Sequence, residues 1–178
     1  MVLRLEFLGD ACVGLLVCEH LFTKLGGRSG ERVWDEGAMS RLKDALVSNQ
    51  FLGRRLAHRL QRVGLSLDEV VLTTQDRIKD NLQRWHAQDR QRPRANSPEE
   101  LATLVYSQPR RVPYAPELPK VAADMYEAIV GAMLIDSDYD TARVWRQCLR
   151  SDFDLDLAPA LALPGFNMDD NDNFAEYM

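Results

Sequence analysis

The sequence predicts a single domain with an all-α fold, on three observations. Apolar residues recur at helical spacing in most segments. No segment alternates apolar and polar residues as a half-buried strand does. With 178 residues, of which 46% are hydrophobic and 28% charged, the composition is that of one globular domain.

The first half of the chain is predicted to form three helices. Residues 5–22 are apolar on nearly every side, and their length favours a buried helix over a buried strand. Residues 37–48 carry apolar side chains at helical spacing. Residues 50–63 place phenylalanine and leucines on one side and arginines on the other, which predicts an amphipathic surface helix.

Short helical and irregular segments are predicted in the middle of the chain. Residues 66–72 suit a helical turn or an extended segment, and residues 74–89 suit a further helix. Prolines make residues 90–98 and 107–119 irregular, with a short helix expected at 98–106.

Two more helices and a tail complete the prediction. Residues 120–135 are almost wholly apolar and therefore buried, whereas residues 138–151 are amphipathic. Residues 152–178 contain seven acidic and no basic residues, which predicts a disordered acidic tail. Without this tail, residues 1–151 have 22 basic against 20 acidic side chains, so the net charge of −5 does not exclude a nucleic-acid partner.

The cysteines indicate the compartment. Cys12, Cys18 and Cys148 are scattered among apolar residues, which predicts buried free thiols in a reducing, intracellular compartment. The cytoplasm or the nucleus fits best, and a mitochondrial location stays open. No apolar run approaches the roughly 20 residues that span a bilayer, and no secretory leader opens the chain, so no membrane is expected.

Four carboxylates lie in the two apolar helices. Glu6 and Asp10 are four residues apart, and Asp124 and Glu127 are three apart, so each pair lies on one helix face. Burying one unpaired carboxylate destabilises a fold by several kcal/mol. Two carboxylates on one face also repel, which raises at least one pKa. A positive charge must therefore meet these faces.

Two interpretations of that positive charge stay open from spacing alone. Oxygen ligands without cysteine or histidine suit Mg²⁺ or Mn²⁺. Gly9, Gly14 and Gly131 would let the two helices approach closely enough to share the ion. Alternatively, basic side chains of other helices, such as Arg41 or Lys43, pair with the acids.

Three segments resemble one known family. RLEFLGDA at Arg4–Ala11 resembles the signature helix of ribonuclease III catalytic domains, and KVAADMYEAIVGAMLID at Lys120–Asp136 is similar to the family's second active-site helix. EGAMSRLKDALVSN at Glu36–Asn49 is similar to a connecting helix between them. The resemblance implies a ribonuclease III-like helical bundle over residues 1–151.

The resemblance also implies a function. By position, Glu6, Asp10, Asp124 and Glu127 would bind catalytic Mg²⁺, with Mn²⁺ as an alternative, and would serve as the catalytic residues. The implied activity is endonucleolytic hydrolysis of double-stranded RNA in RNA processing, which leaves 5′-phosphate and 3′-hydroxyl ends. The implied partners are double-stranded RNA and either a second copy or a second ribonuclease III domain.

The sequence departs from the family in three places. Leu3 stands where the family usually has a glutamate. The sequence also begins almost on the signature, so we expect the family's first helix or two to be missing. The region from Gln50 to Lys120 is longer than in bacterial members and looks more like that of Dicer-type enzymes.

Several side chains are candidates for contact with RNA or with a partner. A basic cluster could bind phosphates or form a solvated helix face; it consists of Arg54, Arg55, Arg59 and Arg62. Phe7 and Leu8 are expected in the core or at a dimer interface, and the core is favoured. The alternatives to an active nuclease are a catalytically inactive ribonuclease III-like domain, which binds RNA or dimerises, and an unrelated helical interaction protein.

Overall fold

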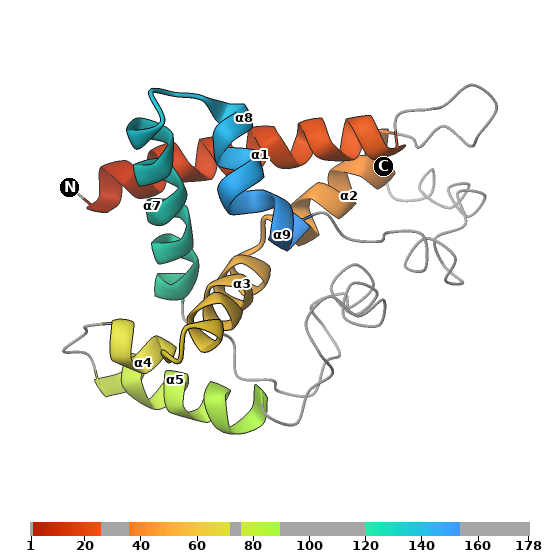
Figure 1. Ribbon diagram of the computed structural model, residues 1–178. Coiled ribbons are helices and arrows are strands. Elements are labelled where there is room, and N and C mark those ends of the chain that lie inside the picture. The colour runs from red at the N-terminus through yellow and green to blue at the C-terminus, as the bar shows by residue number, and fades with distance from the viewer. Residues whose placement is uncertain (1, 26–35, 72–75, 90–119, 154–178) are drawn as a thin grey trace, which may run out of the picture.

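The computed structural model describes residues 2–25, 36–71, 76–89 and 120–153 (Figure 1). All regular structure within these ranges is helical, which confirms the predicted all-α class. The predicted loops at 90–98 and 107–119, the helix at 98–106 and all but the first two residues of the predicted tail at 152–178 lie outside the described residues.

The long helices α1 (Val2–Leu25) and α7 (Lys120–Asp136) cross in the N-terminal half of α1 (Figure 1). Both were predicted; α1 extends three residues beyond each predicted end, and α7 extends one residue beyond its predicted C-terminal end. They cross at two glycines, because a Cβ atom on Gly9 would overlap the carbonyl of Glu127 and one on Gly131 would overlap the carbonyl of Leu5. The predicted role of Gly14 is wrong, since no atom of the described residues lies within 4 Å of a Cβ built there.

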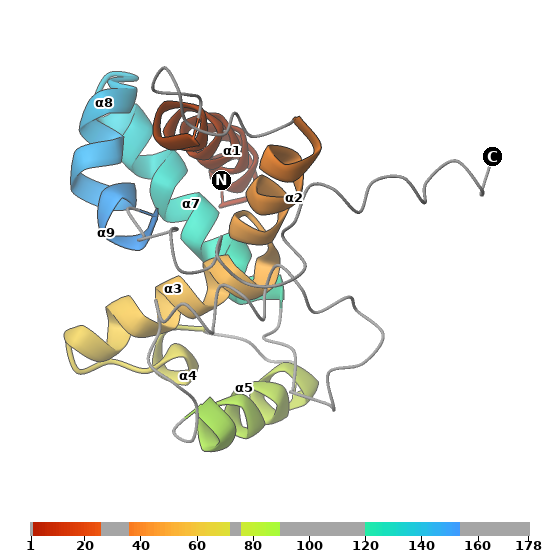
Figure 2. The ribbon, with the colours of Figure 1, turned by 90° about the vertical axis from the view of Figure 1, so that its right-hand side faces the viewer.

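Helix α3 (Asn49–Arg62) packs against α7 and is joined to α1 through α2 (Glu36–Leu46). It begins at Ser48, whose Oγ accepts a hydrogen bond from the backbone N of Phe51 (3.3 Å). Figure 2 shows α3 leading from the group of α1, α2 and α7 to a separate pair of helices, α4 (Leu67–Val70) and α5 (Asp76–Asp89).

The last helix differs most from its prediction. It starts at Thr141 rather than 138, because Asp138 and Tyr139 have positive φ angles of 55° and 62° that interrupt the helix after α7. Asp140 then caps the new helix by accepting a hydrogen bond from the backbone N of Arg143 (2.8 Å). The helix comprises α8 (Thr141–Val144), a π-helical turn η1 (Trp145–Leu149) and α9 (Arg150–Phe153).

The last helix continues two residues past the predicted end of the domain at residue 151. Asp152 and Phe153 are 5% and 1% exposed and belong to the core. The acidic composition after Ser151 suggested a tail, but Asp152 is buried because Arg59 and Tyr126 bond to it.

Surface and thiol predictions have mixed outcomes. Cys12 and Cys148 are buried and unbridged as predicted, whereas the free Cys18 is exposed. The reducing compartment inferred from these thiols stays a prediction. Among the described residues, none of the helices has the length and apolar character needed to cross a bilayer.

Candidate metal centre

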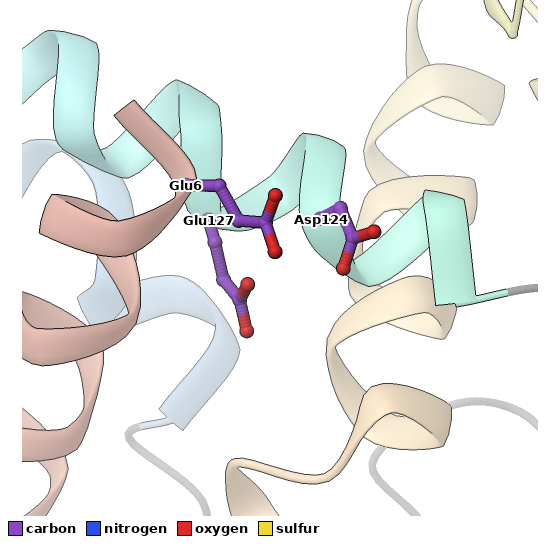
Figure 3. Close-up of side chains that lie close together, drawn as sticks. All are labelled: Glu6, Asp124 and Glu127. Carbon is purple, nitrogen blue, oxygen red and sulfur yellow. The ribbon is translucent and has the colours of Figure 1, made fainter. Parts of the chain in front are cut away.

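Three carboxylates from α1 and α7 meet beside the helix crossing. Glu6, Asp124 and Glu127 each offer an oxygen, and these atoms all lie within 4.8 Å of one another. Figure 3 shows the three carboxyl groups directed into the same space. Glu127 is buried, with 7% of its surface exposed, and the other two are half-buried.

Local and tertiary geometry both contribute to this cluster. Asp124 and Glu127 share a face of α7 because residues three apart lie almost one helical turn apart. Glu6 comes from α1, and the contact at Gly9 and Gly131 places its turn against the backbone of α7. The two glycines are therefore part of the site as well as of the fold.

Asp10 lies at the edge of the cluster. Its side chain is exposed, and it is not among the three residues whose oxygens converge. It lies close enough for its charge to raise the pKa of Glu127 more than any other charge does. The structure thus gathers three of the four predicted ligands and places the fourth nearby.

Glu127 has a strongly shifted proton affinity. Burial is the largest cause, followed by the charges of Asp10 and Asp124, and together they raise its pKa from 4.5 to about 7. The ammonium of Lys120 opposes this shift. Without a cation, Glu127 thus gains its proton near neutral pH rather than near pH 4.5.

Lys120 is a further residue of the site, and helical spacing accounts for its contact with Asp124 but not for its contact with Glu6. Its Nζ donates to Oε1 of Glu6 (3.2 Å) and to Oδ1 of Asp124. The hydrogen bond to Asp124 is the main cause that raises its pKa to about 12. Arg41 and Lys43, the predicted partners, have no such role in the described structure: Arg41 is exposed and Lys43 pairs with Asp44 at 3.4 Å. Lys120 stands four residues before Asp124, a helical spacing that marks it as a partner.

The side chains present fit a divalent cation. If all four carboxylates are ionised, as they would be with a metal bound, they and one ammonium give a local charge of −4 + 1 = −3, so Lys120 alone does not neutralise them. All the donors that converge are carboxylate oxygens, which are preferred ligands of Mg²⁺ and Mn²⁺. The side chain of Lys120 is 62% exposed and can move away from the carboxylates.

The basic cluster of α3 is not the uniform surface predicted for RNA contact. Arg55 is 3% exposed, and its guanidinium lies 4.2 Å from the centre of the Phe51 ring. Arg59 is bonded to Asp152. The idea of a solvated arginine face is therefore wrong for these two residues, because α3 packs on more than one side. Arg54 is half-buried, and Arg62 is exposed.

The fold is thus an all-helical one in which two crossing helices bring three carboxylates together, an arrangement that suits a divalent cation. The family model described as Ribonuclease III domain matches residues 3–138. The chain therefore belongs to the ribonuclease III domain family, whose members include double-stranded-RNA endoribonucleases. The resemblance of the signature helices is confirmed.

Several curated proteins that the chain resembles are Dicer proteins. The chain is 30% identical over 153 residues to "Dicer-like protein 1" of Chaetomium globosum, covering 79% of this chain and 9% of that protein. It is 31% identical over 143 residues to "Endoribonuclease Dicer homolog 3" of Arabidopsis thaliana, covering 80% and 7%. "Endoribonuclease Dicer-S" of Xenopus laevis is 26% identical over 147 residues, with coverage of 80% and 7%. The chain thus spans less than a tenth of the length of these three relatives, and no solved structure matches it significantly.

Proposed function

We propose that this chain is a divalent-metal-dependent endonuclease domain that cuts double-stranded RNA in RNA processing and leaves 5′-phosphate and 3′-hydroxyl ends. The convergence of Glu6, Asp124 and Glu127 at the crossing of α1 and α7 carries the proposal. Membership of the ribonuclease III family supports it, because this crossing joins the family's two signature helices.

The residues of the site have distinct roles in this proposal. Glu6, Asp124 and Glu127 would hold Mg²⁺ or Mn²⁺, with Asp10 adding negative charge at the edge. When bound, the metal would activate water as the nucleophile and stabilise the leaving oxygen. Glu127 must first release its proton. The ammonium of Lys120 must turn away from Glu6 and Asp124, and its exposed position leaves it free to face a phosphate.

Cleavage of a perfect RNA duplex in Mg²⁺ tests the proposal. We expect the wild-type chain to cut the duplex and Glu127→Gln to cut it at least about 100-fold more slowly, since an amide offers no negative oxygen to the metal. Glu19→Gln, an exposed substitution elsewhere on α1, is the control and should keep wild-type activity. Equal rates for wild type and Glu127→Gln would contradict the proposal.

A catalytically inactive ribonuclease III-like domain is the second candidate. Two observations favour it: Lys120 occupies two of the carboxylates, and Leu3, which is 78% exposed, replaces the family's usual glutamate. This candidate predicts binding of the duplex that weakens with salt, without cleavage by the wild-type chain.

We further propose that a second copy, or a second ribonuclease III domain, packs against α1. Phe7 is 79% exposed, so its predicted core position is wrong, whereas Leu8 is half-buried against the core. Large exposed apolar side chains share one side of α1; they are Leu3, Phe7, Leu15 and Phe22. Such a patch is typical of a protein interface.

Analytical ultracentrifugation tests this interface. The wild-type chain should show a concentration-dependent dimer, and Phe7→Lys should weaken dimerisation at least about tenfold because it places a charge in an apolar contact. Val63→Lys, at an apolar site just after α3 that is 69% exposed, should dimerise as the wild type does. A monomeric wild-type chain at all concentrations would contradict self-association, and equal dimerisation of Phe7→Lys and wild type would contradict the surface.

A further inference from the structure

Three helices, α3, α7 and α9, meet at a buried carboxylate. Asp152 of α9 accepts hydrogen bonds on one oxygen from the hydroxyl of Tyr126 (2.7 Å) and from Nε of Arg59 (2.8 Å). Asp152 is 5% exposed and Tyr126 is 2% exposed. These three residues, here called the Asp152 cluster, bind α3, α7 and α9 together.

The polar groups of the Asp152 cluster have hydrogen-bond partners. The guanidinium of Arg59 also donates to the carbonyl oxygen of Cys148 in the π-helical turn, and it lies 5.7 Å from the centre of the Tyr126 ring. Hydrogen bonds between buried charged groups are strong, and a polar network whose members all have partners holds one geometry. The Asp152 cluster is thus a rigid attachment point for α7.

Tyr126 connects this attachment point to the carboxylates. It directly precedes Glu127, so the two side chains leave α7 in different directions: one toward α3 and α9, the other toward Glu6 and Asp10. The Tyr126 hydroxyl, at the far end of the side chain, donates a hydrogen bond to Asp152 and so restrains the rotation of α7. A rotation of α7 by about 10° about its axis would move the Glu127 carboxyl by about 1 Å, given a Cα radius of about 2.3 Å plus the length of the side chain.

We propose that Tyr126 and Asp152 are positioning residues of the metal centre, which fix the rotation of α7 and hold Glu127 in place to bind a divalent cation. The inference deepens the proposed function and rests on it. The glycine contact sets how closely α1 and α7 approach, and the Asp152 cluster sets which way α7 faces. Displacements of about 1 Å in a binding constellation weaken its function strongly.

Calorimetric titration of Mn²⁺ into the folded full-length chain tests the inference without any RNA. Tyr126→Phe removes only the hydroxyl, and we expect the Kd for Mn²⁺ to rise 3- to 10-fold, with helical circular dichroism unchanged. Asp152→Asn is an independent second variant and should raise the Kd similarly. The double variant should resemble each single variant, because both substitutions break the same contact.

Ser137→Ala is the matched control. The Ser137 hydroxyl is buried just beyond the end of α7 and donates to the carbonyl oxygen of Leu134 (3.0 Å), so the substitution also deletes one buried hydroxyl bond. We expect both Ser137→Ala and Tyr126→Phe to lower the Tm by a few degrees, but Ser137→Ala should leave the Kd unchanged. Unchanged Mn²⁺ affinity in both Tyr126→Phe and Asp152→Asn would overturn the positioning role while the proposed function stands. An equal rise of the Kd in Ser137→Ala would also overturn it, because any loss of stability would then weaken Mn²⁺ binding. A wild-type chain without saturable Mn²⁺ binding would overturn the proposed function and this inference together.

Discussion

Gly9→Ala is expected to destabilise the domain by at least about 3 kcal/mol and to abolish metal binding. The added methyl group would overlap the carbonyl oxygen of Glu127 and approach the backbone of Gly131. Neither of these backbone groups can move without the whole helix, so α1 and α7 would have to separate. Separation would uncover the apolar side chains between the helices and withdraw Glu6 from Asp124 and Glu127. Urea denaturation measures the stability, and Mn²⁺ titration measures the site.

Gly14→Ala is the control for Gly9→Ala. Both glycines lie inside α1, but a Cβ on Gly14 meets no atom of the described residues within 4 Å. Alanine favours helix over glycine by about 1 kcal/mol, so Gly14→Ala should stabilise the domain slightly. If Gly9→Ala were as stable as Gly14→Ala, the close crossing of α1 and α7 would be wrong.

Mn²⁺ affinity is expected to fall roughly tenfold for each pH unit below 7, because Glu127 must lose a proton before its carboxylate binds the metal. The reason is its pKa of about 7, which burial and then the charges of Asp10 and Asp124 raise. Titrations at pH 8, 7, 6 and 5.5 measure the effect. Glu127→Gln has no such proton, so its weaker affinity should change much less over this range. An equal affinity of the wild type at pH 8 and 5.5 would contradict the shift.

The same pKa makes the metal-free domain less stable at higher pH. Glu127 holds its proton more tightly when folded, with a pKa of about 7, than when unfolded, near 4.5. The folded state therefore binds more protons between these values, and the stability contribution is full below pH 4.5 and lost as pH rises through 7. The free energy of unfolding falls by at most about 3 to 4 kcal/mol over this pH range. With saturating Mn²⁺, which binds the ionised carboxylate, the free energy of unfolding should instead rise with pH.

Helix positions were predictable wherever one local pattern was sufficient. Segments 5–22 and 120–135 are apolar on nearly all sides, and both became central helices, α1 and α7. Segment 138–151 carried the same helical pattern to its start, yet the helix begins at Thr141. Asp138 and Tyr139 interrupt the helix through positive φ angles, and the spacing of apolar residues does not predict backbone angles.

Charge was the weakest guide to position. The arginines of α3 looked like a solvated face, but Arg55 lies over Phe51 in the core. Asp152 looked like the start of an acidic tail, but it is buried between Arg59 and Tyr126. A charged residue is buried when a partner satisfies it, and sequence composition does not show the partner.

Helical periodicity was enough to place Glu6 with Asp10 and Asp124 with Glu127, because residues three or four apart share a helix face. The apolar surroundings of each pair then required a positive charge nearby, since buried carboxylates without a partner are unfavourable. Helical periodicity could not say which charges meet between helices. Lys120 reaches Glu6 across 114 positions, and Arg59 reaches Asp152 across 93. Such contacts depend on the distance between α1, α3, α7 and α9 and on the rotation of each about its axis, so the tertiary structure decides them and the sequence pattern does not.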